Sequence, residues 1–327
     1  MKVIKPSATI YDPRDERIND RAVEKAEFCG RVCYNSLSNI EPGSAYDFVK
    51  RTAESGHGSV MEHGSVYLKF PSTDAGFMRV NLILSEVFSS PHTLNNLDRV
   101  YTNLRVIYEG LRDWQKPDKP FLFERHPEFF EAFVSGGGIS QFGNISYFIP
   151  ALDDPLRRIT VDFIVDRGIT HELVRHRAFS FSQESTRYCN YAGEKEGSEI
   201  TVIDPFFWSK NDKERIIWCD TCKTTERNYM HLVGKGANDY KAKPQEGRSV
   251  LPNSLKARLL MTGNLYQWRE LFKLRLSQGA HPQMLEVIVP LHQWFVENIS
   301  AEYFDQSKFL NPSDLAALYK FQGTLRR

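Results

Sequence analysis

The chain has 327 residues, a formal net charge of +1, and 41% hydrophobic and 13% aromatic residues. No apolar run approaches the roughly 20 residues that cross a bilayer, so the composition is typical of a globular protein and argues against a membrane role. The small net charge gives no general attraction to a nucleic-acid backbone, so binding of a polynucleotide would need a local basic patch. Small anionic ligands suit this charge balance better.

The cysteines and the N-terminal residues favour a cytoplasmic location. The five cysteines are an odd number spread along the chain, which is not the dense, even framework of a small secreted domain. Cys219 and Cys222 have the spacing of half a zinc site or of a redox pair, but no second such pair completes a metal shell, so a structural role is favoured. Residues 11–15 are too polar and too early to leave room for a secretory signal core.

The N-terminal residues predict short helices and one strand. Helical spacing runs over Ala22–Tyr34 and again over Asp47–Glu54. Residues 55–64 form a glycine-spaced polar loop of a kind that often binds ligands, and Ser65–Phe70 is strand-like.

Residues from about 71 to 155 are predicted to form an insertion in a single domain that spans residues 1–327. The insertion contains an expected helix over Leu97–Trp114 and a proline-rich linker at 116–120. It also contains the glycine run 136–138, a weak candidate for a phosphate loop.

The remaining pattern predicts an α+β fold. Ile159–Val165 alternates like a strand, and a helix is expected to begin between Asp166 and Ile169. Helices are also expected over residues 224–237, 248–262, 264–276 and 282–296, the last kinked at Pro290. We therefore expect a mixed or antiparallel central sheet flanked by helices. No GxGxxG follows a strand, so a doubly wound nucleotide-binding fold is not supported.

The most informative segment begins with Arg175, His176 and Arg177, followed after seven residues by Ser185 and then by Arg187. Guanidinium is planar and permanently charged, and it can hold a phosphate or a uracil edge through two parallel hydrogen bonds. This concentration of arginines and hydroxyls therefore predicts a site for a nucleotide.

The spacing of these residues resembles the signature of the flavin-dependent thymidylate synthases. The resemblance implies that family's fold and its reaction, which converts dUMP to dTMP with 5,10-methylenetetrahydrofolate as carbon donor. It implies FAD as cofactor, with FADH2 regenerated by NADPH as the hydride donor. It also implies a homotetramer with sites shared between subunits, and partners that include neither nucleic acid nor membrane.

Two further segments carry the resemblance. Residues 245–252, QEGRSVLP, are similar to the family's second signature, which implies that Arg248 grips the dUMP phosphate. Residues 264–275 are similar to the third, which implies that Arg275 is the catalytic residue that favours ionisation of the uracil. A guanidinium suits this role because it stabilises developing negative charge without exchanging a proton.

The resemblance implies two overlapping sets of binding residues and no metal site. The dUMP set is Glu172, Arg175, Gln183, Glu184, Ser185, Thr186, Arg187, Arg248 and Arg275. The FAD set is His57, Ser59, Arg175, His176, Arg177, Gln183, Asn264, Tyr266, Glu270 and His281. Three positions depart from residues found in the family: Glu172 and Glu270 stand where an amide can stand, and Gln183 stands where some relatives have an acid.

Several alternatives stay open from the residues alone. Ser185 has no evident general base beside it, so it is assigned to binding rather than to nucleophilic attack. The aromatic residues Phe179, Phe181 and Tyr188 are expected to pack in the core. The rival functions are a non-catalytic module that binds a nucleotide or nucleic acid, and a diverged flavin reductase that reduces another electron acceptor.

Overall fold

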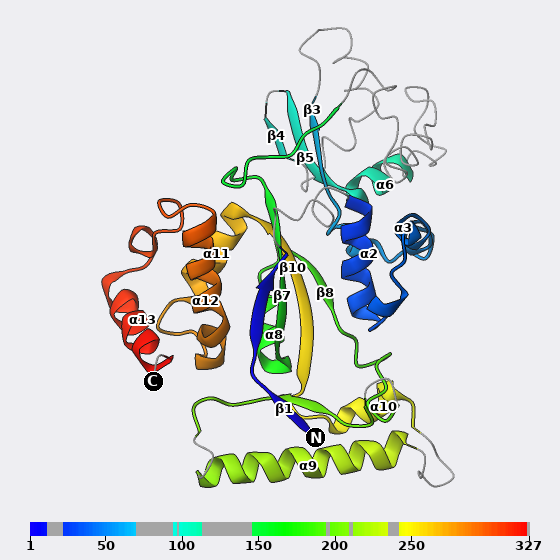
Figure 1. The fold of residues 1–327 in the computed structure, drawn as a ribbon, viewed down its shortest axis with the longest axis vertical. Coiled ribbons are helices and arrows are strands. Elements are labelled where there is room, and N and C mark those ends of the chain that lie inside the picture. Colours follow the sequence, from blue (N-terminus) through cyan, green and yellow to red (C-terminus); the bar gives the residue numbers. More distant parts are fainter. Residues whose placement is uncertain are drawn as a thin grey trace, which may run out of the picture.

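Figure 1 shows the computed structural model of the chain, which describes residues 1–11, 22–69, 94–96, 98–112, 146–193, 197–208, 212–234 and 242–325. A four-stranded antiparallel sheet lies at the centre, with helices on both of its faces. A second four-stranded sheet lies above it in this view, and the long helix α9 (Lys213–Val233) lies below. The predicted α+β fold with an antiparallel or mixed sheet is confirmed.

The central sheet consists, in spatial order, of β2 (Ser7–Ile10), β7 (Arg158–Asp166), β10 (Lys256–Asn264) and β8 (Ser180–Gln183). The long strands β7 and β10 run antiparallel over their full lengths, with Lys256 opposite Asp166 and Asn264 opposite Arg158. The sheet therefore carries the middle of the first signature on β8, and β10 leads directly into the third.

The prediction of a helix over residues 248–262 is wrong. A short helix α10 (Pro244–Gly247) and a 3-10 turn η5 (Arg248–Val250) precede the strand β10 instead. β10 lies between two strands and is covered on both faces, so its residues are buried continuously from Leu259 onward. A short continuous apolar run of this kind does not distinguish a central strand from a buried helix.

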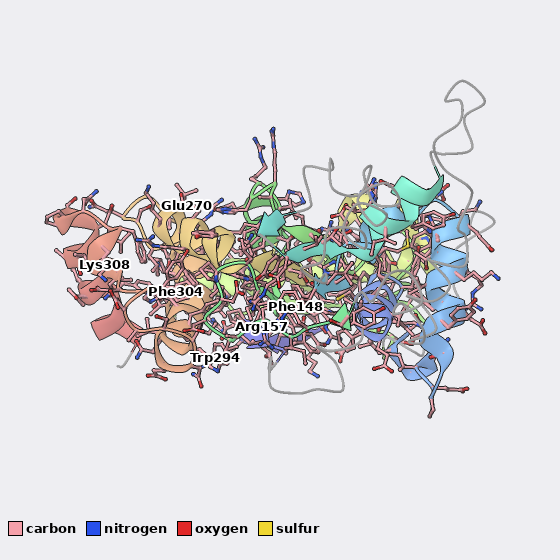
Figure 2. All side chains as sticks on the ribbon, turned by 90° about the horizontal axis from the view of Figure 1, so that it is seen from above. Phe148, Arg157, Glu270, Trp294, Phe304 and Lys308 are labelled. Carbon is pink, nitrogen blue, oxygen red and sulfur yellow. The ribbon has the colours of Figure 1, made fainter. Side chains whose placement is uncertain are left out.

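One face of the central sheet builds the main hydrophobic core. Ile159, Val161 and Phe163 point from β7 towards α11 (Leu265–Arg275) and α12 (Pro282–Asn298). The 3-10 turn η6 (Gln306–Lys308) and α13 (Pro312–Leu325) extend this layer. Figure 2 shows Phe304 between these C-terminal helices, where it is fully buried, and Glu270 at the outer surface of α11. The helices predicted over 264–276 and 282–296 are confirmed.

The opposite face of the same strands is mainly polar and lies under α2 (Ala22–Cys33), where Leu260 of β10 packs against Cys29 and Val32. Thr262 Oγ1 lies 2.7 Å from both Thr160 Oγ1 and His63 Nδ1, and Arg158 donates to Ser180 Oγ at 2.6 Å. Lys25 of α2 is buried against this face, and burial lowers its pKa to about 7. Strand alternation thus places an apolar layer on one side of the sheet and a hydrogen-bonded polar layer on the other.

The second sheet has the strand order β4 (Leu94–Asn96), β5 (Arg99–Asn103), β3 (Ser65–Lys69) and β6 (Ser146–Tyr147). Helices α3 (Ser44–Glu54), α4 (Gly58–Met61) and α6 (Leu104–Arg112) pack beside it, and η1 (Leu37–Asn39) follows α2. The helix predicted over 97–114 is only partly right, because β5 occupies its first residues. Aromatic and β-branched side chains at Val100, Tyr101 and Thr102 favour this strand.

Much of the predicted insertion lies outside the described residues, including the linker at 116–120 and the glycine run at 136–138. The single domain with an insertion therefore stays a prediction. The described residues of this region form β4, β5, α6 and β6, so this part of the chain contributes three strands to the second sheet.

The N-terminal strand β1 (Lys2–Ile4) pairs in parallel with β9 (Thr201–Ile203). Both lie next to α9, which begins at Lys213, earlier than the helix expected from residue 224. Across the described ranges, no helix has the length and apolar character needed to cross a membrane.

Candidate functional site

The first signature lies where a short helix ends. Asp166 caps the N-terminus of α8 (Arg167–Leu173) by accepting a hydrogen bond from the Ile169 amide at 2.8 Å. After Leu173 the chain turns through Arg175 and His176 before β8 begins at Ser180. The prediction that a helix begins between Asp166 and Ile169 is confirmed, since α8 begins at Arg167.

Arg275 at the end of α11 reaches back to this turn and is held there by three hydrogen bonds. Its Nη1 donates to Glu172 Oε2 at 2.8 Å and its Nη2 donates to the Glu172 carbonyl at 2.9 Å. Its Nε donates to His176 Nε2 at 2.9 Å. Residues about a hundred positions apart in the chain thus form one cluster, in which the guanidinium is half-buried and fixed in direction.

His176 is held neutral in this cluster. Burial, followed by repulsion from the neighbouring Arg275 guanidinium, lowers the pKa of His176 to about 4. The neutral ring accepts the Arg275 hydrogen bond at Nε2, which assigns its proton to Nδ1. The cluster therefore holds one guanidinium and one carboxylate beside an uncharged imidazole.

Arg175 and Arg177 differ from Arg275 because both side chains are exposed. Within the described parts of the chain, no side-chain hydrogen bond or ion pair engages either guanidinium. These two cations flank the neutral His176 and are available to an anionic group that approaches from solvent.

The turn after β8 is anchored at its start. Gln183 Nε2 donates to Thr170 Oγ1 of α8 at 2.9 Å, which ties the strand to the signature helix. Glu184 is buried, and its Oε2 accepts a hydrogen bond from Lys256 Nζ at 2.6 Å. Its other carboxylate oxygen is buried without a hydrogen-bond partner among the described residues. Thr186 is also buried, so this turn presents few of its side chains to solvent.

Ser185 is half-buried and Arg187 is exposed on that turn. The Ser185 amide donates to the Cys33 carbonyl at 3.1 Å, and Ser185 Oγ accepts a hydrogen bond from the Arg187 amide at 3.2 Å. The Arg187 guanidinium lies over the Tyr188 ring, 5.6 Å from its centroid. No described histidine or carboxylate is hydrogen-bonded to Ser185 Oγ, which agrees with a binding role.

An exposed aromatic group that was not predicted from the sequence lies beside Arg187. Tyr188 was expected in the core, and this is wrong, because its side chain is 56% exposed. Its ring lies 5.4 Å from that of Tyr34, whose hydroxyl is 3.3 Å from His57 Nδ1. Ser59 is exposed on α4, two positions after His57. The structure thus brings the glycine-spaced loop next to the Ser185–Arg187 turn.

The other two aromatics of the signature lie where expected. Phe179 is buried, and Phe181 packs against the same core cluster. Tyr188 differs because it follows the last residue of β8 by five positions and lies on a turn, where strand alternation no longer applies. Its position directly after Arg187 is the feature of the sequence that could have indicated its exposure.

Arg248 lies on η5 with an exposed side chain. Val250 of this turn packs into the same apolar cluster as Cys189 and Tyr191, which follow the Ser185–Arg187 turn. The second signature is therefore attached to the same part of the molecule as the first, and both present arginines to solvent.

The expected FAD residues of α11 do not all face one site. Asn264 caps the helix, since its Oδ1 accepts from the Gln267 amide at 3.0 Å, so the oxygen of this side chain is already used. Tyr266 and Glu270 are exposed on the outer side of the helix, one turn apart. Arg275 follows Tyr266 by nine positions, which places it roughly 180° around the helix and roughly 14 Å along it. One chain therefore presents Tyr266 and Arg275 in different directions.

His281 is also separate from the Arg275 cluster. It caps the N-terminus of α12, and its Nδ1 accepts a hydrogen bond from the Gln283 amide at 3.3 Å. It lies near Asp166, at the N-terminal end of α8, whereas Glu172 lies near the C-terminal end of that helix.

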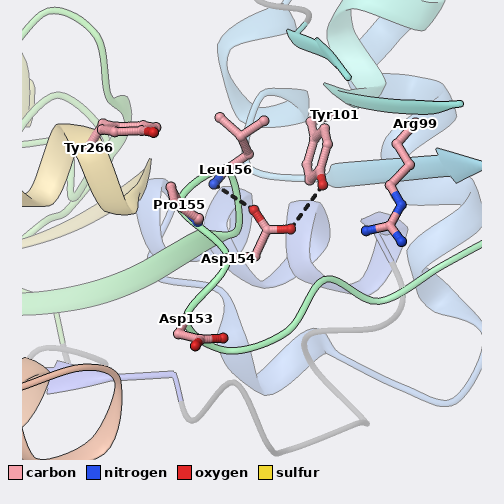
Figure 3. Close-up of a pocket in the computed structure, with 7 residues that line it drawn as sticks. All are labelled: Arg99, Tyr101, Asp153, Asp154, Pro155, Leu156 and Tyr266. Atoms are coloured by element: carbon pink, nitrogen blue, oxygen red, sulfur yellow. Dashed lines mark hydrogen bonds between the residues drawn. The ribbon is translucent and has the colours of Figure 1, made fainter. Parts of the chain in front are cut away.

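An open pocket of about 490 Å³ lies beside Tyr266. Its lining residues come from α11, from β5 and from the turn that leads into β7 (Figure 3). They are Arg99, Tyr101, Asp153, Asp154, Pro155, Leu156 and Tyr266.

The cysteines of the structure are free thiols, including Cys219 and Cys222 on α9. Burial raises the pKa of Cys222 to about 11, so its thiolate is disfavoured. In the described part of the chain, no group of three His, Cys, Asp or Glu side chains is placed to hold a metal ion.

Comparison with known proteins confirms the resemblance over part of the chain. Residues 156–298 match the family described as thymidylate synthase complementing protein. The chain is 34% identical to the flavin-dependent thymidylate synthase of Corynebacterium glutamicum over 134 residues, which cover 38% of this chain and 52% of that protein. It is 34% identical to that of Corynebacterium efficiens over 131 residues and 30% identical to that of Mycobacterium tuberculosis over 135 residues, with the same 38% and 52% coverage.

The chain spans about half the length of the curated relatives it matches. The matched residues 156–298 include all three arginine signatures and every expected site residue except His57 and Ser59.

Proposed function

We propose that this chain, on the basis of its family match over residues 156–298, is a flavin-dependent thymidylate synthase. It would convert dUMP to dTMP with 5,10-methylenetetrahydrofolate as carbon donor, FAD as cofactor and NADPH as reductant. The observation that carries the proposal is the fixed Arg275 guanidinium in contact with the turn of the first signature.

Arg275 is the proposed catalytic residue. Transfer of a carbon to C5 of uracil needs electron density in the ring, which increases when negative charge on the ring nitrogen and carbonyl oxygens is stabilised. A guanidinium supplies that stabilisation without losing a proton, and it acts best when it is already oriented. Glu172 and His176 orient Arg275, and each of its Nη atoms retains one N–H for the uracil edge.

The exposed residues would hold the rest of dUMP. Ser185, Arg187 and Arg248 provide donors for the phosphate, and Arg175 borders the pyrimidine. Arginine suits this task because its planar fork binds two phosphate oxygens at once. Gln183, Glu184 and Thr186 would line the same turn, and the unpartnered oxygen of Glu184 can accept a hydrogen bond from a ligand.

The donor set also fits the charged and polar parts of FAD. Arg175 and Arg177 are exposed cations suited to a pyrophosphate. Further hydrogen-bonding groups come from His176 and Gln183, close to them in the chain, and from His57 and Ser59, beside the Ser185–Arg187 turn. Asn264, Tyr266, Glu270 and His281 complete the proposed set. When bound, the reduced flavin supplies the hydride, and the protein contributes orientation and electrostatics.

Completion of the site between subunits is part of the proposal. Tyr266 and Glu270 face away from Arg275 of their own chain, so a flavin that touches both faces of α11 would need a second copy. A homotetramer with shared sites satisfies this requirement. A cytoplasmic location, which the sequence predicts, is also part of the proposal.

The test is to supply the purified protein with dUMP, methylenetetrahydrofolate, FAD and NADPH, and to measure NADPH oxidation and dTMP together. We expect dTMP formation and NADPH oxidation that depends on dUMP. NADPH oxidation without dTMP would identify a flavin reductase. A colourless protein that binds nucleic acid with a steep salt dependence would identify a binding module instead.

A further inference from the structure

The pocket beside Tyr266 joins the family-matched residues to the predicted insertion. Arg99 and Tyr101 come from β5 of the second sheet, whereas Tyr266 comes from α11 (Figure 3). The volume of about 490 Å³ is in the range of ordinary small-molecule sites. The second sheet thus forms one wall of this pocket.

Three side chains give the pocket its chemistry. Tyr266 is 52% exposed, so much of its ring is available for stacking. Arg99 is an exposed cation at the opposite side, where its guanidinium lies 5.0 Å from the centre of the Phe148 ring. Asp153 is an exposed carboxylate that can accept hydrogen bonds from an amine or from hydroxyls. The site therefore combines a ring platform, an anion-binding group and an acceptor.

The second carboxylate of the pocket is already used. Asp154 accepts hydrogen bonds from the Tyr101 hydroxyl and from the Leu156 amide, both at 2.9 Å. These two donors offset its charge and fix the turn that forms the floor of the pocket. Asp153 and Arg99 are then the exposed charged groups of this lining, and Arg99 Nε lies 3.9 Å from Asp98 Oδ1, which is longer than a hydrogen bond.

The pocket suits the recognition of a ligand rather than reaction with it. Tyr266 lies on the outer side of α11, roughly 14 Å along the helix from Arg275 and roughly half a turn around it. A group bound here cannot also contact Arg275 of the same chain. The pocket is thus suited to the end of a long ligand that does not react.

We propose that this pocket binds the adenosine end of a dinucleotide, with the adenine on Tyr266, its amine or the ribose hydroxyls on Asp153, and a phosphate on Arg99. The inference rests on the proposed function, which uses two dinucleotides, FAD and NADPH. It assigns a role to the described part of the insertion, which supplies the anion-binding wall through Arg99.

The test is calorimetric titration with ADP of the wild-type protein, in both flavin-loaded and flavin-stripped form. Tyr266→Ala and Arg99→Gln should each weaken ADP binding about tenfold, by loss of base stacking and of a charge-assisted contact respectively. Tyr266→Phe should retain wild-type affinity because it keeps the ring. Lys69→Gln is the matched control, since Lys69 is the exposed cation opposite Arg99 on β3 and does not line the pocket.

The two forms of the protein distinguish the source of the adenosine. If the adenosine belongs to FAD, ADP binds only the flavin-stripped protein, and Arg99→Gln lowers flavin retention. If it belongs to NADPH, ADP binds the flavin-loaded protein and competes with NADPH. Two results would overturn the inference. One is that Tyr266→Ala and Arg99→Gln bind ADP as tightly as wild type in both forms, and the other is that neither form of the wild-type protein binds ADP. Binding of ADP is measured without turnover, so this test can succeed or fail independently of the test for thymidylate synthesis.

Discussion

The arginines of the three signatures fall into two groups with different surroundings. Arg275 is half-buried and fixed by Glu172 and His176, whereas the side chains of Arg175, Arg177, Arg187 and Arg248 are exposed. A group that must act on a developing charge benefits from an orientation set before the ligand arrives. A group that only grips a phosphate can be ordered by the ligand itself, at a cost in side-chain entropy.

Replacement of the fixed arginine should have the largest effect. Arg275→Ala should reduce kcat about 100- to 1,000-fold, the usual loss when one oriented charge-stabilising donor is removed from a transition state. Flavin binding should be retained, because the exposed cations are unchanged. Steady-state dTMP formation and the flavin absorption spectrum would be measured together.

Lys273→Ala is the matched control for that variant. Lys273 is an exposed cation on the same helix, two positions before Arg275, and it is not part of the cluster. It should retain wild-type kcat. Full activity in Arg275→Ala would refute the assigned catalytic role.

The exposed arginines should affect binding more than turnover. Arg187→Ala and Arg248→Ala should each weaken dUMP binding roughly 10- to 100-fold, the range expected for loss of a charge-assisted hydrogen bond to phosphate. Their kcat at saturating dUMP should change little. Titration with dUMP at two salt concentrations would measure this, with the exposed Arg227 of α9 replaced by alanine as control. A fall in kcat as large as that of Arg275→Ala would remove the distinction between the two groups.

Glu172, whose carboxylate is paired with Arg275, provides a further test of the difference between the fixed arginine and the exposed ones. Glu172 shares the guanidinium with any anionic uracil edge, so Glu172→Gln should keep a hydrogen-bond acceptor while removing the competing charge. The pair is partly exposed and worth at most about 1 kcal/mol, so dUMP affinity should rise by no more than about fivefold. Equilibrium dialysis with labelled dUMP would measure this change. Unchanged or weaker binding would show that Glu172 supports the ligand rather than competes with it.

The sequence predicted the positions of the arginines but not how they are held. The signatures and the helix over 264–276 followed from local spacing, because an apolar face and capping residues lie within a few turns. The contact between Arg275 and Glu172 joins residues that are 103 positions apart. It depends on how α8 and α11 pack on one sheet, which no local pattern encodes.

Two predictions from the sequence were wrong for related reasons. β10 was expected to be helical because a central strand is buried on both faces and loses the alternation that identifies strands. Tyr188 was assigned to the core from its spacing after Phe179 and Phe181, but β8 ends at Gln183, so the alternation does not continue to residue 188. The pocket at Tyr266 could not be foreseen, since Arg99 reaches it only through the pairing of strands in the second sheet.

The smallest expected effect is on the free energy of unfolding, and it comes from His176, the neutral hydrogen-bond partner of Arg275. The pKa of His176 is lowered from its ordinary value near 6.5 to about 4 in the folded protein, through burial and then through Arg275. Between these values the unfolded chain binds more protons than the folded protein, so the free energy of unfolding should fall as the pH falls from about 6.5 towards 4. Above pH 6.5 the group should contribute no pH dependence.

His176→Gln isolates this contribution, because glutamine can accept the Arg275 hydrogen bond but does not titrate. The buried His63 and His292, whose pKa values are also lowered by burial, contribute the same slope to both proteins. The difference between the two denaturation curves, followed from pH 7 to pH 4, therefore reports on His176 alone. A shallower pH dependence in the variant would support a neutral imidazole that fixes Arg275. Identical curves would mean that His176 titrates as in the unfolded chain, and Arg275 would then be oriented by Glu172 alone.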